Sequence, residues 1–323
     1  MSCSCNLMGG LGNQLFQIFT TIAYAADNEL PFYFSSEYNL RVGTIRHTYW
    51  NTFLKGLKEF TRTPLIKSDK LSELNTTIQE AFALKGINKK INDGPFLVLR
   101  EKRFAFNSLS SINNRETKII LHGYFQSALY FDHCKDTIFK MIRLFELKRE
   151  VVERNPGYKY LKDDLETKTI SLHFRLGDYK FLQDYHPIML KEYYLDALLY
   201  VIKSLSSNSD ISVLVIKVLY FCEEADLPEV LETIAFLQVH FTNINININN
   251  IQFEKVDSRL DDWEQMLLMS LCQNNIIANS TFSWWAAYFN TNANKMVCCP
   301  KIWFGPRANH DTKDLYLDEW IKI

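Results

Sequence analysis

From residue 168 onward, short apolar segments alternate with segments of helical period, and this alternation limits the possible folds more than any other feature of the chain. The expected strands are Thr169–Phe174, Ser212–Phe221, Gln252–Val256 and Asn275–Ala278, and the expected helices are Leu190–Leu205, Leu227–Phe236, Trp263–Cys272 and Phe282–Phe289. Strands and helices in this order form a parallel sheet with helices on both faces. We therefore predict an α/β fold.

The N-terminal half shows the same alternation less regularly, with strands expected at Cys5–Met8, Pro31–Ser35 and Lys118–Leu121 and helices expected at Asn13–Ala26 and from Ser127. Residues 40–115 are polar and patchy and give no assignment. A turn at Asn155-Pro156-Gly157 marks a boundary. We predict an N-terminal α/β domain at 1–165, a C-terminal Rossmann-type domain at 166–300, and a segment at 301–323 that packs back on the first domain. The Asn-rich run 243–250 is expected to be an exposed loop.

Composition excludes several classes of protein. The 323 residues are 47% hydrophobic, which provides ample core, and the net charge of −1 disfavours nucleic acid as a partner. Residues 1–7 lack the basic start of a signal peptide, and no segment reaches the ~18 to 20 apolar residues of a membrane span. The seven cysteines show no zinc spacing, which favours a reducing compartment. We expect a cytoplasmic protein without a membrane anchor.

The segment NSTFSWW, which begins at Asn279, follows an expected strand and opens an expected helix. The first N–H groups of a helix have no intrahelical partner, and the helix dipole adds about half a positive charge there. Anions bind such positions, and the hydroxyls of Ser280, Thr281 and Ser283 add donors. The alternative is an ordinary Ser/Thr helix cap in front of two core tryptophans.

The segment HFRLGDY places His173 and Arg175 at the end of a strand, where alternation points both side chains to one face. An arginine fork suits a pyrophosphate, which it binds through two charge-assisted hydrogen bonds. Asp178 could hold Arg175 or His173, or act on a substrate. The alternative is a structural pair between Arg175 and Asp178.

The segment MGGLGNQLFQ places glycines after the first strand, as nucleotide-binding folds do, but Leu15 stands where G-x-G-x-x-G requires glycine. A nicotinamide-dependent oxidoreductase is therefore disfavoured. The run Gly12-Asn13-Gln14 can bring amides close to a sugar, or can simply form a tight turn. No Asp-x-Asp motif occurs anywhere in the chain, which favours a phosphate site built from an arginine and a helix start over one built on a metal ion.

These segments together resemble the α-1,2-fucosyltransferases of glycosyltransferase family 11. The resemblance covers nearly the whole chain. The matching segments are MGGLGNQLFQ, HGYFQS from His122, HFRLGDY, NNIIANSTFSWWAAY and CCPKIWFG from Cys298, in that order. Three departures are Gln265 in place of an Asp, the longer acids Glu223 and Glu224 after the middle strand, and Ala286 where Gly is frequent.

The resemblance implies a GT-B-like architecture of two facing Rossmann-type domains with parallel sheets. It implies metal-independent, inverting transfer of L-fucose from the donor substrate GDP-β-L-fucose to a glycan acceptor, most often the 2-hydroxyl of a β-galactoside. The arginine that clamps the pyrophosphate corresponds to Arg175, with His173 beside it. The donor-binding turn corresponds to Asn279, Ser280, Thr281, Phe282 and Ser283. The segment that contacts the fucose, called the sugar-side segment below, corresponds to Gly12 and Asn13.

The general base is open at this stage. Asp178 is the first candidate by motif, His173 is the second, and a reaction driven by leaving-group stabilisation alone is the third. Two other functions also stay open, namely a fucosyltransferase of different linkage and a non-catalytic protein that binds glycans or nucleotides on the same fold.

Overall fold

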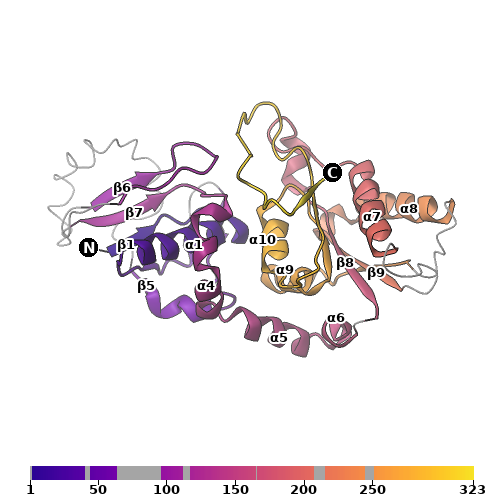
Figure 1. Ribbon diagram of the computed structural model, residues 1–323, viewed down its shortest axis with the longest axis horizontal. Coiled ribbons are helices and arrows are strands. Elements are labelled where there is room, and N and C mark those ends of the chain that lie inside the picture. Colours follow the sequence, from indigo (N-terminus) through magenta and orange to yellow (C-terminus); the bar gives the residue numbers. More distant parts are fainter. Residues whose placement is uncertain are drawn as a thin grey trace. The chain divides into compact units, whose positions relative to one another are not determined.

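The computed structural model describes residues 2–40, 44–63, 96–111, 117–164, 166–206, 215–243 and 251–323. The chain divides into two compact units. Unit 1 comprises Met1–Phe145 with His310–Leu317, and unit 2 comprises Glu146–Asn309 with Asp318–Ile323. Each unit is built around its own parallel sheet (Figure 1).

Unit 2 has a six-stranded parallel sheet in the order β10-β9-β8-β11-β12-β13. Helices α7 and α8 cover one face and α9 and α10 cover the other (Figure 1). The strands are β8 (Lys168–His173), β9 (Ile216–Phe221), β10 (Ile251–Lys255), β11 (Asn274–Ile276), β12 (Val297–Cys299) and β13 (Ile321–Lys322), and the helices are α6 (Tyr160–Asp163), α7 (Lys191–Ser206), α8 (Leu227–Asn243), α9 (Asp262–Leu271) and α10 (Thr281–Phe289), with 3-10 turns η6 (Pro156–Tyr158), η7 (Gly177–Phe181) and η8 (Glu224–Asp226).

The strand order of unit 2 locates its ligand-binding edge. Counted along the chain, the order is 3-2-1-4-5-6, which is the order of a dinucleotide-binding sheet. The chain leaves β8 toward β9 and β10 and later returns to the other side of β8 with β11. Leu172 in β8 accordingly lies between Tyr220 in β9 and Ile276 in β11. In open α/β sheets, ligands bind beyond the carboxyl ends of the strands at this switch point.

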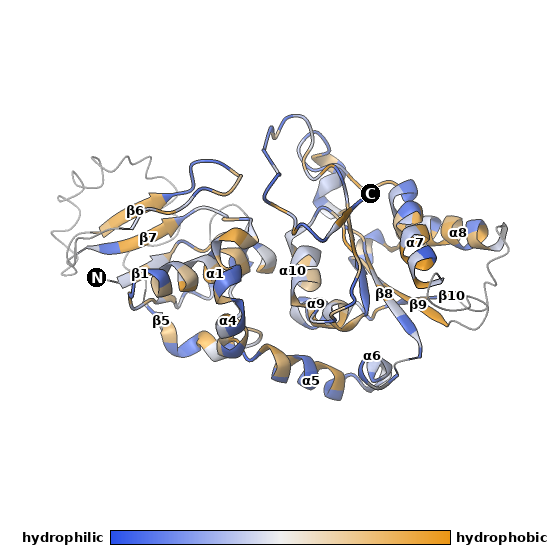
Figure 2. Cartoon of the chain, viewed as in Figure 1, coloured by the Kyte–Doolittle hydropathy of each residue, from blue (hydrophilic) through white to orange (hydrophobic). Residues whose placement is uncertain are grey.

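Burial explains why these segments became strands. Thr169 and Ser171 on β8 are buried as well as Ile170 and Leu172, which point to the opposite face, as expected for a sheet covered on both faces. Figure 2 shows hydrophobic residues running along β9 in unit 2 and β6 in unit 1. The α/β fold with parallel sheets predicted from the sequence is confirmed.

Unit 1 has a three-stranded parallel sheet in the order β1-β7-β6, and Cys3 of β1 also bridges to Phe32 on the other side. The elements are β1 (Ser2–Cys5), α1 (Leu11–Asp27), β2 (Phe34–Ser35), β3 (Asn39–Leu40), β4 (Arg46–His47), β5 (Thr61–Arg62), β6 (Phe96–Arg100), β7 (Lys118–His122) and α4 (Lys135–Met141), with 3-10 turns η1 (Lys55–Phe60), η4 (Ala128–Tyr130) and η5 (Asp132–Cys134). Helix α5 (Leu144–Arg154) begins in unit 1 and lies mostly in unit 2. The chain turns from β1 to one side of the sheet and later returns to the other, so the switch point of unit 1 lies between β1 and β7.

The structure differs from the sequence-based expectations in several places. The first strand covers Ser2–Cys5, whereas the prediction placed it at Cys5–Met8. The sequence pattern missed this strand because Cys3 and Ser4 are buried in spite of their modest hydrophobicity. The units change at residue 145 rather than 165. The C-terminal segment divides, with His310–Leu317 in unit 1 and the rest in unit 2. The Asn-rich segment lies outside the described residues beyond Asn243.

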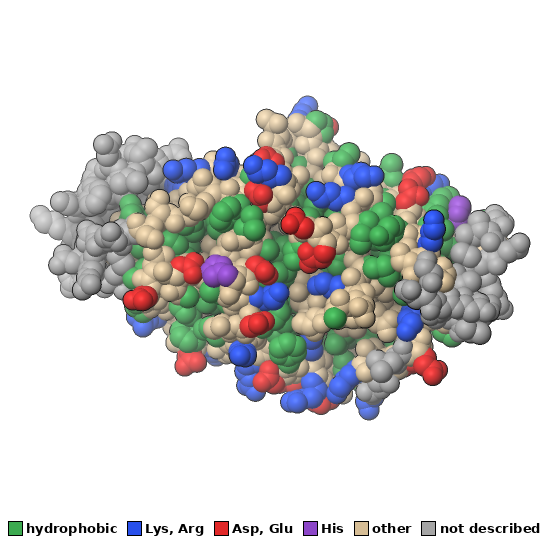
Figure 3. Space-filling model, in the orientation of Figure 1, with side chains coloured by type: hydrophobic (Ala, Val, Ile, Leu, Met, Phe, Trp, Pro, Cys, Tyr) green, Lys and Arg blue, Asp and Glu red, His purple; other side chains and the backbone are tan. Residues whose placement is uncertain are grey.

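No helix within the described ranges combines the length and apolarity needed to cross a membrane. On the face shown in Figure 3, acidic and basic side chains are interspersed.

Candidate functional site

The two motifs predicted to bind phosphate meet at the switch point of unit 2. His173 ends β8, and the NSTFS turn follows β11, the neighbouring strand. The imidazole of His173 and the ring of Phe282 have centroids 5.6 Å apart. The hydroxyl of Tyr179 donates a hydrogen bond to the backbone carbonyl of Asn279 at 3.2 Å. The sheet therefore brings together segments that are about a hundred residues apart in sequence.

Arg175 is held by two carboxylates and an aromatic ring. Its guanidinium donates to Asp178 at 2.5 Å and to Glu223, which follows β9. Its Cζ lies 5.1 Å from the centre of the Tyr179 ring, a cation–π distance. The side chain is about one-quarter exposed, so a ligand can still reach it. The geometry is compatible with both interpretations of Arg175 from the sequence. Asp178 does form the structural pair with Arg175, and the guanidinium stays accessible to a pyrophosphate.

The loop that carries Arg175 is tied to the neighbouring strand end. Gly177 has a φ of +38°, in the left-handed region that favours glycine, and its N–H donates to the Asp226 carboxylate at 2.8 Å. Lys180 approaches the same buried carboxylate at 2.9 Å. Glu223 lies against Gly177, where an added Cβ would be 3.3 Å from the carboxylate. A larger residue at 177 would crowd the acid that holds Arg175.

His173 is buried, and burial together with the nearby charge of Arg175 lowers its pKa to about 3. The imidazole is therefore neutral near pH 7. The hydroxyl of Tyr194 donates to its backbone carbonyl at 3.2 Å. Within the described residues, its Nδ1 atom has no hydrogen-bond partner. A buried polar atom without a partner is uncommon in folded proteins and fits a position that a ligand or water completes.

The NSTFS turn starts α10 with a serine cap. Ser280 has extended backbone, and its side chain accepts a hydrogen bond from the N–H of Phe282 at 3.3 Å. Thr281 and Phe282 are half-buried, whereas Ser280 is buried. The helix start faces the carboxyl edge of β8 through the contact between His173 and Phe282. This first turn contains no acidic residue, so its dipole is not offset locally.

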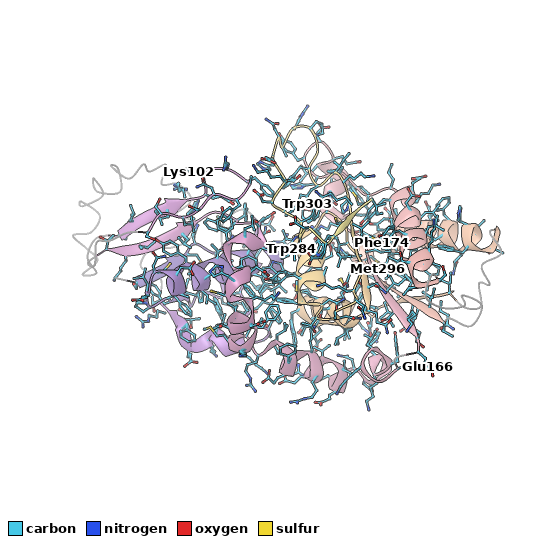
Figure 4. All side chains as sticks on the ribbon, in the orientation of Figure 1. Lys102, Glu166, Phe174, Trp284, Met296 and Trp303 are labelled. Carbon is cyan, nitrogen blue, oxygen red and sulfur yellow. The ribbon has the colours of Figure 1, made fainter. Side chains whose placement is uncertain are left out.

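Two predicted donor-binding side chains face inward instead. The hydroxyl of Ser283 is fully buried and donates to the carbonyls of Ala278 and Ser280. The Nδ2 atom of Asn279 donates to the carbonyls of Pro187 and Trp303, at 2.8 and 3.0 Å. Figure 4 labels Trp303 and, on α10, Trp284. These two polar side chains shape the turn rather than present donors to a ligand.

The far end of α10 is fixed by lysines and aromatic packing. The Nζ atom of Lys148 donates to the carbonyl of Phe289 at 2.6 Å, and Lys295 donates to the carbonyls of Ala287 and Asn290. Positive charge at a helix C-terminus is favourable. Trp284 packs 5.4 Å from Trp320, ring centre to ring centre. Hydrogen bonds and ring packing therefore hold the helix whose first turn forms the candidate anion site.

In unit 1, the predicted sugar-side segment forms the turn from β1 into α1. Gly9 has a φ of +76°, and an added Cβ there would meet the Asn13 side chain at 2.5 Å. Gly12 is buried in α1, so only its backbone can contribute, whereas Asn13 is half-buried. Gln14 donates to the carbonyls of Gly9 and His47, and Gln17 bonds to the backbone of Met8. Both glutamines therefore hold the turn.

The HGYFQS segment follows β7 and completes the carboxyl edge of unit 1. Asn6 donates to Nδ1 of His122 at 3.2 Å, and burial, with the charge of Arg100, lowers the pKa of His122 to about 4. The Glu101 carboxylate accepts from the N–H groups of Tyr124 and Phe125 at 2.8 and 3.0 Å. These contacts tie together the carboxyl ends of β1, β7 and β6.

Among the described residues, one group of three could hold a metal ion, namely Asp27, His133 and Cys134 in unit 1. Asp27 and His133 are exposed and already paired at 2.9 Å. None of the three is a predicted site residue.

The comparisons with known proteins agree with these motifs. Residues 242–323 match the model of glycosyl transferase family 11. The Escherichia coli O-antigen biosynthesis glycosyltransferase WbnK is 31% identical over 208 residues, which cover 63% of this chain and 60% of WbnK. The Escherichia coli alpha-1,2-colitosyltransferase is 25% identical over 328 residues, which cover 98% of this chain and 97% of that protein.

The C-terminal segment 242–323 of this chain is therefore similar to glycosyl transferase family 11, and the two longer matches are to glycosyltransferases.

A solved structure shares the GT-B fold of this chain. The structure of an Arabidopsis thaliana FUT1 mutant in complex with GDP superposes with a TM-score of 0.52 at 13% identity, covering 92% of this chain and 70% of that one. The likeness concerns the fold alone.

Four residues of the two strand edges were not assigned a role from the sequence. Glu223 pairs with Arg175, Asp226 anchors Gly177, and Glu101 and Gln126 organise the turn after β7. Both Glu223 and Asp226 lie just after a strand, beside the motif strand β8. Their position at the end of a strand could have marked them as site candidates in the sequence. Which residues they contact, however, depends on the order of the strands in the sheet.

Proposed function

We propose that this protein transfers L-fucose from GDP-β-L-fucose to the 2-hydroxyl of a β-galactoside in a glycan acceptor, with inversion at the anomeric carbon to give an α-1,2-fucoside. The single observation that supports this most is the position of Arg175 and the start of α10 at the switch point of one parallel sheet. A guanidinium and a helix start are the two groups best suited to a diphosphate.

The diphosphate would bind where Arg175 now meets carboxylates. A guanidinium has five N–H donors, and Glu223 and Asp178 use donors on its two terminal nitrogens. Phosphate oxygens accept from the same fork geometry, so the donor can exchange with or add to these carboxylates. The N–H groups at 281–282 and the half-buried hydroxyl of Thr281 would bind further phosphate oxygens.

The same groups would stabilise the transition state. As the bond from fucose to the β-phosphate breaks, negative charge grows on the phosphate and positive charge grows on the sugar. Arg175 and the helix start are already oriented, so they stabilise this charge without reorganisation during the reaction. This needs no metal ion, and we propose a reaction without metal or other cofactor.

For the general base we place Asp178 before His173. His173 is buried, so an acceptor hydroxyl reaches it less readily than it reaches an exposed carboxylate. Asp178 is about half exposed and lies beside Arg175. His173 would then bind the donor as a neutral hydrogen-bonding group. Gly12 and Asn13 in unit 1 would contact the sugar, as the family resemblance implies.

The full-length relative favours a second donor sugar. The alpha-1,2-colitosyltransferase covers 98% of this chain, and colitose is a deoxygenated analogue of fucose. GDP-colitose is therefore the second candidate donor, with the same diphosphate site. We place the reaction in the cytoplasm, a reducing compartment, because all seven cysteines are free thiols.

The test begins with the nucleotide. GDP at 100 times its Kd should stabilise the protein by about 2.7 kcal/mol, and NAD should not stabilise it. Transfer is then measured with GDP-fucose and GDP-colitose on an acceptor array, with and without EDTA, and NMR gives the product linkage. GDP binding without release of GDP from either donor would favour the non-catalytic alternative, and stabilisation by NAD instead of GDP would overturn the proposal.

A further inference from the structure

The amide of Gln126 is bonded to the amide of Asn13, and this contact joins the two motifs of unit 1. The Nε2 atom of Gln126 donates to Oδ1 of Asn13 at 3.0 Å. Gln126 follows β7, and Asn13 lies in the first turn of α1, after β1. The bond therefore crosses the switch point of the unit 1 sheet, beside the bond between Asn6 and His122.

This bond determines which atom Asn13 presents. A carboxamide has one acceptor oxygen and one donor nitrogen. With Oδ1 engaged by Gln126, Nδ2 is the atom left to bind a ligand. Gly9 packs against the same side chain, since an added Cβ there would be 2.5 Å from Nδ2. The side chain is thus restrained from two sides.

Gln126 itself is fixed by its surroundings. It is 7% exposed, and its neighbour Phe125 has a φ of +53°, an unusual conformation for a residue with a side chain. Glu101 holds this conformation by accepting from the N–H groups of Tyr124 and Phe125, and Ser127 caps the next turn. Within the described residues, Oε1 of Gln126 has no hydrogen-bond partner.

We propose that Gln126 is a positioning residue that turns the Asn13 amide so that its N–H donor faces an oxygen atom of the sugar. This rests on the proposed function, in which Asn13 contacts the sugar. Gln126 acts only through Asn13. Its donor role is the essential one, because an acceptor at position 126 would attract Nδ2 and leave Oδ1 facing the ligand.

The decisive variant is Gln126→Glu, compared with Gln126→Met. An ionised carboxylate cannot donate to Oδ1, whereas a protonated carboxyl can. A carboxyl in this buried position titrates above the usual pKa of about 4.3. We expect kcat of Gln126→Glu to be about tenfold to hundredfold below wild type at pH 8, and to approach wild type as the carboxyl protonates. Gln126→Met should lose a similar factor without recovery at low pH, and GDP affinity should stay unchanged in both.

Gln238→Glu is the control, because it makes the same chemical change at an exposed glutamine of α8 in unit 2, outside the turn that presents Asn13. Its pH dependence should parallel wild type. A Gln126→Glu profile parallel to wild type, or a wild-type kcat in a folded Gln126→Met, would overturn the proposal.

A second readout needs no substrate. The side-chain ¹⁵Nδ2 signal of Asn13 should shift with the titration of the introduced carboxyl in Gln126→Glu and not in Gln238→Glu. If wild type binds no GDP and transfers no fucose, the proposed function fails, while this NMR titration still decides whether Gln126 orients Asn13. An Asn13 signal that does not respond to the titration would refute the positioning role.

Discussion

The carboxylate of Asp226 accepts a hydrogen bond from the backbone N–H of Gly177 at 2.8 Å. Asp226 is buried and ends the turn after β9, whereas Gly177 belongs to the loop after β8. The same carboxylate lies 2.9 Å from Nζ of Lys180. One buried acid thus holds both ends of the turn that follows Arg175, and the position of Arg175 depends on it.

Replacing Asp226 should therefore weaken both the fold and the nucleotide site. Asp226→Ala removes the acceptor of the half-buried Gly177 N–H and the partner of Lys180, which costs about 1 kcal/mol or more of unfolding free energy. Asp226→Asn keeps an acceptor and should fall between Ala and wild type. Urea denaturation measures the first effect, and GDP titration should show weaker binding in the same order. Equal GDP affinity in Ala and wild type would show that the loop does not need this anchor.

Arg175→Ala should nearly abolish transfer without unfolding the protein. Removing one preorganised donor from a developing anion typically costs about 10²–10³ in rate. Arg175→Lys should recover only part of this, since a lysine lacks the two-pronged fork. The measurement is kcat/KM for GDP release, with a thermal melt as the check on folding.

Arg259→Ala is the matched control for this loss of charge, because Arg259 is an exposed arginine of unit 2 that pairs with Asp257. It should keep wild-type turnover. If Arg175→Ala also turns over at the wild-type rate, Arg175 does not bind the diphosphate.

The segments that the sequence predicted best are those whose pattern is local. The β8 strand was predicted one residue away from its observed ends, because Ile170 and Leu172 lie in a continuous buried run. The start of α10 was predicted from Ser280 and the following tryptophans, and both tryptophans are fully buried. The proximity of these two segments followed from the rule that parallel strands share a carboxyl edge.

The contacts that the sequence did not predict join residues far apart in the chain. Glu223 and Asp226 lie 48 and 49 residues from their partners Arg175 and Gly177. Which acid meets the arginine depends on β9 being the neighbour of β8, and no local pattern determines strand order. The strand β1 was misplaced for a different reason, since Ser4 is small and polar yet buried.

Thr281→Val and Ser283→Ala should separate ligand binding from helix stability. Thr281 is half-buried at the start of α10, so losing its hydroxyl should weaken GDP binding by about 1.5–3 kcal/mol, roughly ten- to hundredfold in Kd. Ser283 bonds inward, so Ser283→Ala should cost about 1 kcal/mol of unfolding free energy and leave GDP affinity unchanged. Calorimetric titration and urea denaturation give the two quantities, and a reversed pattern would contradict this assignment.

His173, which is buried, and His122, which is half-buried, should make the fold sensitive to acid. Burial lowers the pKa of His173 to about 3 and that of His122 to about 4, against about 6.5 in the unfolded chain. Below pH 6.5 the unfolded chain binds protons that the folded chain does not, so the unfolding free energy falls as pH falls. The slope is at most about 1.4 kcal/mol per pH unit for each histidine.

Unfolding free energies of wild type and His173→Phe, measured in urea at pH 7 and pH 5, test this effect. The variant should lose less stability on acidification. His47, which is exposed, provides the control in His47→Gln, whose loss should equal that of wild type. Equal losses in wild type and His173→Phe would show that His173 does protonate in the folded protein.

Lys148 should produce the opposite dependence at alkaline pH. Its Nζ is buried against the carbonyl of Phe289, and burial, with repulsion from Lys295, lowers its pKa from 10.5 to about 7. Between about pH 7 and 10.5 the unfolded chain holds a proton that the folded chain releases, so the unfolding free energy rises with pH, by at most about 1.4 kcal/mol per unit. Lys148→Met should remove this rise in urea denaturation between pH 7 and 9, whereas Lys203→Met, at an exposed site on α7, should keep it. A Lys148→Met slope equal to that of wild type would mean that Lys148 stays charged where it caps α10.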